Sequence, residues 1–208
     1  MNRGSVLSVS THQGTAPLGI SLEAREIFLL MPNVAQLTRW VISQSTGDKT
    51  LPYFDPLDGG VYAKILILLE SPARTVSRAR YVSRDNPGPA QRNLKSFMEQ
   101  VGLERRETVI WNLYPWLPDL EKPKASLRRA QIEEGIEKLI TLLPHFPDLA
   151  TVVFAGRVAQ QAMLRVRHAF PDISLLEMPH PSPLSVCTHP SVRQRILSTL
   201  RDAKQSIE

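Results

Sequence analysis

A histidine near the C-terminus stands in the rigid stretch "MPHPSPLS", residues 178–185. Proline fixes φ and lacks a backbone N–H donor, so the three prolines around His180 predict a stiff loop that is neither a helix nor a central strand. A stiff loop is useful where a side chain has to be held at one angle. The motif therefore predicts a positioned imidazole, although taken alone it would equally suit a surface turn with a solvated histidine.

Polar residues also end three other apolar runs. "AKILILLE" ends in Glu70 and is followed by Ser71, "TVIWN" ends in Asn112, and "TVVFAG" is followed by Arg157. Short continuous apolar runs of this kind indicate strands that are covered on both faces. Ligands of open parallel sheets bind beyond the carboxyl ends of the strands, so we expect a carboxylate, an amide and the imidazole on one rim.

These runs alternate with helical patterns, which indicates an α/β domain with a mostly parallel sheet. Residues 1–20, rich in Ser, Thr and Gly, are expected to form a loose arm, and residues 21–208 a single domain. Pro32 should break or kink the first helical pattern. Strands are predicted at residues 63–70, 108–112, 151–156 and 173–180, and helices at residues 21–43, 89–101, 126–143, 157–169 and 191–204.

The composition excludes several classes of protein. Hydrophobic residues make up 42% of the 208 residues and charged residues 22%, which are ordinary globular values. The lone Cys187 excludes a disulfide framework, a four-cysteine zinc site and a cysteine-bound iron–sulfur cluster. Because no run reaches transmembrane length and no secretory signal is visible, we expect a cytoplasmic protein without a membrane partner. Lys plus Arg outnumber Asp plus Glu by 25 to 20, which slightly favours a polyanionic partner.

Three motifs carry a resemblance to a known family. "HPSPLS" resembles the second signature motif of the uracil-DNA glycosylase superfamily, and "VIWNLYPW" is similar to its strand that ends in a base-reading asparagine. "LLESPA" lies where the first, water-activating motif belongs, and the resemblance covers roughly residues 51–200. It implies a three-layer α/β/α sandwich around a central, mostly parallel four-stranded sheet. It also implies an enzyme that removes uracil from DNA without a metal or a cofactor. We expect the protein to be a monomer and its partner to be single- or double-stranded DNA that contains uracil.

The resemblance implies roles for individual residues. His180 would donate a hydrogen bond to uracil O2, where negative charge develops, with a backbone carbonyl orienting the other nitrogen of the neutral ring. Asn112 would read uracil O4 and N3–H, although such an amide can also cap the turn before Pro115. Tyr81 would stack on the flipped base, or else it belongs to the core.

DNA contacts are implied around the same loop. Leu184 would fill the gap that a flipped base leaves in the stack, while Ser182 and Ser185 would bind backbone phosphates. An exposed leucine between two serines has little structural purpose, which favours the wedge. A basic segment could add phosphate contacts or be a solvated loop; its arginines are Arg74, Arg78, Arg80 and Arg84.

The first motif departs from the family pattern. Many members carry an aspartate one residue after the position of Glu70, where it orients the attacking water, whereas this chain has Ser71 and other branches have Asn or Ala. A missing general base costs about 10²–10⁴ in rate. The replacement predicted here is Asp85 in the turn-rich "SRDNPGP", with Glu70 and Asp55 as alternatives. Asp85 could equally form an ordinary turn.

Two functions fit these observations. The first is a monofunctional uracil-DNA glycosylase of base excision repair. The second, with which Ser71 is compatible, is a catalytically weak or silent module that binds uracil-containing or abasic DNA. An unrelated hydrolase that pairs His180 with a serine is less favoured, because the chain has no Gly-x-Ser-x-Gly elbow. Cys187 is taken as incidental, because no His and Asn or Asp spacing supports a cysteine nucleophile.

Overall fold

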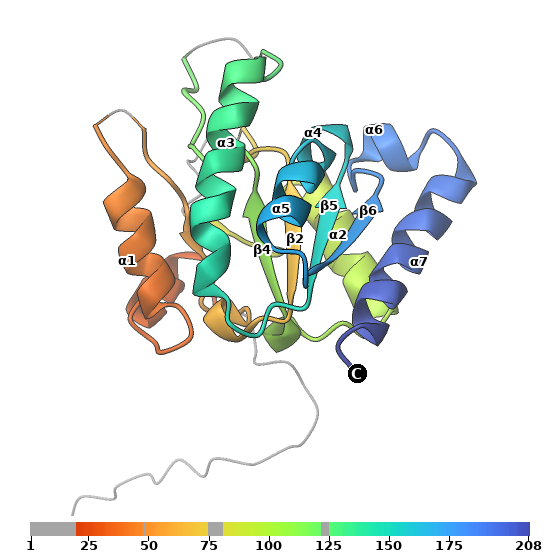
Figure 1. Ribbon diagram of the computed structural model, residues 1–208, viewed down its shortest axis with the longest axis horizontal. Coiled ribbons are helices and arrows are strands. Elements are labelled where there is room, and N and C mark those ends of the chain that lie inside the picture. Colours follow the sequence, from red (N-terminus) through yellow and green to blue (C-terminus); the bar gives the residue numbers. More distant parts are fainter. Residues whose placement is uncertain (1–19, 48, 75–80, 122–124) are drawn as a thin grey trace, which may run out of the picture.

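The computed structural model describes residues 20–47, 49–74, 81–121 and 125–208, and it confirms the expected α/β fold (Figure 1). All four strands of the central sheet are parallel. Three of them are buried at every residue, as their continuous apolar sequences predict, while the last strand is an edge strand with exposed positions. The strands lie in the order β4 (Thr108–Asn112), β2 (Ile65–Leu69), β5 (Thr151–Ala155) and β6 (Ser174–Met178).

Helices cover both faces of this sheet (Figure 1). The crossovers run in opposite directions, from β2 to β4 and then from β4 to β5, and right-handed crossovers in opposite directions place their helices on opposite faces. α2 (Pro89–Gln100) accordingly packs with α7 (Pro190–Gln205) on one face, and α3 (Arg129–Leu142) packs with α5 (Met163–Ala169) on the other. The sandwich is therefore three-layered, and the strand order reverses at β2.

An N-terminal unit packs at the β4 edge. The ring of Phe54 stacks on that of Trp111 with centroids 4.0 Å apart, and Trp40 meets Trp111 edge-on at 5.9 Å. These aromatic contacts attach α1 (Ala35–Gln44) and the short strand β1 (Tyr53–Phe54) to β4.

Several local features differ from the sequence expectations. The helix predicted at 21–43 is interrupted around Pro32, as expected, but its first part is the 3₁₀ helix η1 (Glu23–Phe28). The helix predicted at 157–169 is divided into α4 (Arg157–Gln160) and α5. The proline-rich stretch was predicted to contain no helix, and this is wrong, because Pro183 begins the single-turn helix α6 (Pro183–Val186) at its first position, where an N–H would have no partner within the helix. The remaining elements are β3 (Tyr81–Val82) and the 3₁₀ helices η2 (Gly60–Tyr62), η3 (Arg105–Glu107) and η4 (Leu143–His145).

The predicted arm at 1–20 falls, except for Ile20, outside the described residues. Among the helices that the structure describes, none is long and apolar enough to cross a membrane.

Candidate active site

The carboxyl ends of the four central strands lie at one level of the sheet. Leu69 is paired with Asn112, and Ala155 with Met178, so all four strands stop within about one residue of each other. The residues that follow therefore share one rim, at the place where the strand order reverses and where open α/β sheets bind ligands. On this rim lie Glu70, Ser71, Gly156, Pro179 and His180.

A cleft of about 930 Å³ opens at this rim. Segments that follow β2, β4, β5 and β6 contribute to its walls, together with the start of α2 and one residue of α7. Seven residues that the sequence marked as candidates line it: Glu70, Ser71, Arg74, His180, Ser182, Leu184 and Ser185.

The ring of His180 is held by the backbone of its own loop. The Ser182 N–H donates to His180 Nδ1 at 3.2 Å. A backbone amide can only donate, so Nδ1 accepts, and a neutral ring then carries its proton on Nε2. The expectation of a carbonyl that orients the ring is not met at Nδ1, which accepts from an N–H instead. The loop is also tied to α2, since Asn93 Nδ2 donates to the Pro181 carbonyl at 2.8 Å.

Gly156 gives His180 its space. Its φ of +89° is a conformation that favours glycine, and a Cβ built there would lie 2.9 Å from the Cβ of His180. The chain therefore needs a glycine at the end of β5 so that the histidine loop can pack against the sheet.

Asn112 and Tyr81 line a second, much smaller cavity of about 20 Å³, enough for one water molecule. Both side chains are buried, with 3% and 2% exposure. No hydrogen bond joins the side-chain amide of Asn112 to any residue that the structure describes, so it does not cap the turn before Pro115. The small cavity, called here the base pocket, shares four wall residues with the cleft: Leu69, Pro72, Ala73 and Gln91.

Comparison with known proteins agrees with this arrangement. The family model described as the uracil DNA glycosylase superfamily matches residues 57–203. The chain belongs to the uracil-DNA glycosylase superfamily. Its fold is similar to that of SMUG2 from Pedobacter heparinus, with a TM-score of 0.50 and 13% identity over 70% of this chain and 76% of that one. Mimivirus uracil-DNA glycosylase is 15% identical over 81% of this chain and 74% of its own, with a TM-score of 0.47. No curated protein matches the chain.

For this member of the uracil-DNA glycosylase superfamily, the structure presents Leu184 to solvent. The side chain is 90% exposed on the first turn of α6, at the edge of the cleft. Ser182 and Ser185 flank it and are half-buried. An apolar side chain therefore protrudes into solvent beside the cleft.

Arg84 does not line the cleft, so the structure does not support the phosphate contact that was predicted for it. The side chain is 5% exposed, donates to the Thr108 hydroxyl and lies 3.4 Å from Asp58. Arg78 and Arg80 are outside the described residues. The described arginines that do line the cleft are Arg74, Arg157 and Arg195.

For two of these cleft arginines no role was predicted from the sequence. Arg157 follows the strand β5, where the rim argument could have pointed to it, whereas Arg195 lies on α7 and gave no local signal. Both side chains are exposed.

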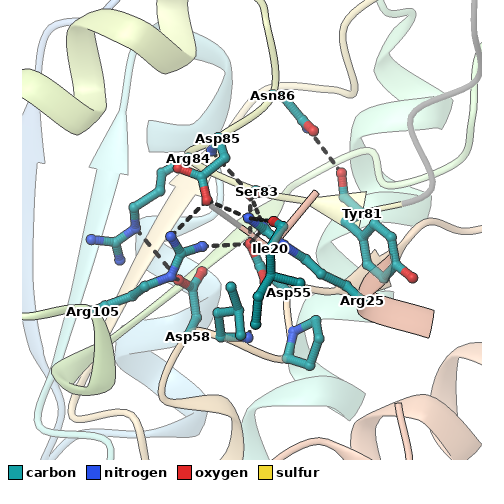
Figure 2. A network of polar contacts seen from close by, with 12 residues as sticks. Ile20, Arg25, Asp55, Asp58, Tyr81, Ser83, Arg84, Asp85, Asn86 and Arg105 are labelled. Atoms are coloured by element: carbon teal, nitrogen blue, oxygen red, sulfur yellow. Dashed lines mark hydrogen bonds and ion pairs between the residues drawn. The ribbon is translucent and has the colours of Figure 1, made fainter. Parts of the chain in front are cut away.

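Asp85 is also misassigned as the water-activating carboxylate. It lines neither cavity, and its oxygens lie 2.6 Å from Arg25 and 2.7 Å from Arg105 (Figure 2). Lys95 lies 2.9 Å from the same carboxylate. Burial alone would raise the pKa of Asp85, but hydrogen bonds from these three cations hold it well below its ordinary value. A carboxylate with such a low pKa is a poor base.

Asp55 belongs to the same group of ion pairs and is 1% exposed, so it cannot replace Asp85. Glu70 is the one acidic side chain among the described residues that line the cleft. Within the part of the chain that the structure describes, no group of three or more His, Cys, Asp or Glu side chains could hold a metal ion.

Proposed function

We propose that this protein is a monofunctional uracil-DNA glycosylase, which hydrolyses the N-glycosidic bond of uracil in DNA and leaves an abasic site. The observation that carries the proposal is the pairing of two groups at one rim. His180 offers an N–H donor in the cleft, and Asn112 offers an amide that makes no side-chain hydrogen bond to the described residues in the adjoining base pocket. Together they suit a ligand that develops negative charge and has a polar edge.

Asn112 supplies discrimination between bases. An amide has both a donor and an acceptor, which complement uracil O4 and N3–H, whereas cytosine presents the opposite pattern at those positions. The burial of Asn112 strengthens this discrimination, because a mismatched base would leave a buried polar group unpaired.

His180 supplies charge stabilisation. When the bond between C1′ and N1 breaks, the bonding electrons leave with uracil, whose anion carries charge on O2, and the sugar becomes oxocarbenium-like. The Nε2–H of His180 donates to O2 as this charge develops, and a pre-aimed donor of this kind is worth about 2.7–4 kcal/mol. Water then bonds to C1′ and gives up a proton, for which Glu70 is the acceptor we propose.

The base pocket has to widen before a base can enter it, because it has room for a single water molecule. The wall shared with the cleft, at Pro72, Ala73 and Gln91, is the part that must yield. Leu184 then occupies the gap in the base stack, and Arg157 and Arg195 contact phosphates of the bent strand.

A second function is a module that binds uracil-containing or abasic DNA with little or no catalysis. Ser71 is the residue that suggests it, because it stands where many members have the water-orienting aspartate. The two functions separate in one assay. The purified protein is incubated with a uracil-containing oligonucleotide, and abasic sites are then cleaved with alkali. Strand scission that persists in excess chelator supports the metal-free glycosylase, whereas binding without scission supports the module.

A further inference from the structure

One wall of the base pocket is formed by a very short β-strand. Tyr81, Val82 and Ser83 line the pocket, and the first two form β3, which among the described strands pairs only with the two residues of β1. A two-stranded ribbon of this length is marginal by itself in water. The ladder alone therefore does not explain how this wall keeps its position.

A buried hydroxyl connects the wall to charged side chains. Ser83 Oγ donates to Asp55 Oδ2 at 2.5 Å, and it accepts from Arg25 Nη1 at 3.1 Å and from the Asp85 N–H at 3.0 Å (Figure 2). One donor and two acceptor positions are all that a hydroxyl has, so Ser83 is fully bonded.

Two guanidinium groups bridge the ends of the two short strands. Arg25 reaches Asp55, just after β1, at 2.5 Å and Asp85, just after β3, at 2.6 Å. Arg105 spans the same two carboxylates at 2.6 and 2.7 Å. Arg25 is 4% exposed, and paired charges with this degree of burial hold a defined geometry.

Arg25 comes from a different part of the chain than the wall it holds. It lies on η1, N-terminal to residues 57–203, which the superfamily model matches. Its guanidinium also donates to the Ile20 carbonyl at 3.3 Å, so the N-terminal segment itself is part of the bridge.

We propose that Arg25 is a positioning residue for base selection: by bridging Asp55 and Asp85 it fixes β3, so that the wall formed by Tyr81 and Ser83 stays in place when the opposite wall yields to a base and leaves no room for a 5-methyl group. The inference rests on the proposed function. A pocket wall typically discriminates by about 10–200-fold against one methyl group, and that selectivity depends on the wall not moving.

The test compares Arg25→Met, Arg25→Lys and the control Arg106→Met, whose side chain is exposed in a surface pair with Glu104. The readout is the ratio of kcat/KM for uracil and for thymine in matched single-stranded oligonucleotides. We expect Arg25→Met to lower this ratio by about tenfold, Arg25→Lys to restore part of it because ammonium can hold one carboxylate but not bridge two as a fork, and Arg106→Met to leave it unchanged.

Hydrogen exchange of residues 81–86 is measured on the same proteins and does not depend on catalysis. Faster exchange in Arg25→Met, but not in Arg106→Met, is expected. Unchanged exchange would overturn the bridge, and faster exchange with an unchanged base ratio would overturn its role in selection. If Arg25→Met does not fold, Asp85→Asn provides the same two readouts, since it weakens both bridges and lines neither cavity.

If the wild-type protein releases no base, the proposed glycosylase activity is refuted, but the role of Arg25 in base selection still has to be measured. In that case the ratio is read from the affinities of uracil- and thymine-containing oligonucleotides. The same tenfold loss of preference is expected in Arg25→Met, and an unchanged preference contradicts the inference.

Discussion

At the scale of single residues, the atom that each side chain presents to the cleft decides its chemistry. His180 is fixed by a backbone N–H and therefore presents a donor. Glu70 is the acidic group on the described cleft wall. Asp85, the other predicted base, instead forms ion pairs with three cationic side chains away from the cleft. Residue type alone could not distinguish these two carboxylates.

Glu70→Gln is expected to slow single-turnover uracil release by about 10²–10⁴, the usual cost of a lost general base, because no other described carboxylate lines the cleft. Asp85→Asn and Ser71→Ala are the comparisons, and both should retain most of the rate. A nearly full rate in Glu70→Gln together with a large loss in Asp85→Asn would reverse the assignment.

Leu184→Ala is expected to reduce uracil release from duplex DNA far more than from single strands, because only a duplex has a gap for the wedge to fill. Leu164→Ala is a matched control, since this leucine is 77% exposed on α5, which does not contribute to the cleft. Equal losses on the two substrates in Leu184→Ala would contradict the wedge.

At the scale of elements, the sequence predicted the four central strands and the rim on which they end. Their signal is local, because each is a continuous apolar run between turn residues. β1 and β3 were missed, since two residues have no periodicity to detect. Arg84 and Asp85 were misplaced for a related reason: their position follows from β3 and from partners up to 60 residues away, such as Arg25.

The turn after β5 gives a prediction at this scale. Gly156→Ala is expected to lower stability by about 1–2 kcal/mol through its positive φ and, in addition, to slow uracil release by displacing His180. Gly47→Ala is the control, because Gly47 also has a positive φ but a Cβ there would meet nothing within 4 Å. Denaturant melts and single-turnover rates are compared, and a wild-type rate in Gly156→Ala would show that the close approach to His180 does not matter.

At the scale of the whole molecule, the buried charges make stability depend on pH. Burial raises the pKa of Asp58 to about 7, an effect which Arg84 opposes and Asp55 reinforces. A folded-state pKa above the ordinary 3.8 means that the folded protein holds this proton more tightly than the unfolded chain. The resulting stability is full below about pH 4 and is lost as the pH rises to 7. Asp85 acts in the opposite sense, contributing stability that is lost on acidification.

Asp58→Asn replaces the titrating carboxyl group with an amide, whose protonation does not change in this pH range. The free energy of unfolding of the variant, measured relative to that of wild type, should increase between pH 5 and pH 8 by about 2–3 kcal/mol, because only wild type loses the stability that the Asp58 proton supplies. Urea melts at the two pH values measure this difference, with the exposed Asp148→Asn as control. A difference that is the same at both pH values would rule out a raised pKa for Asp58.

The central claim is that the rim carrying His180 and Asn112 cleaves uracil from DNA. Its most direct measurement is a single-turnover assay on one uracil-containing strand with alkaline cleavage, for wild type, His180→Ala and the surface control His168→Ala. We predict scission by wild type and His168→Ala, and a rate about 10²–10³ lower for His180→Ala, with DNA affinity little changed because the bond strengthens mainly as charge develops. No scission by the wild-type protein, or equal rates in all three, would contradict the account.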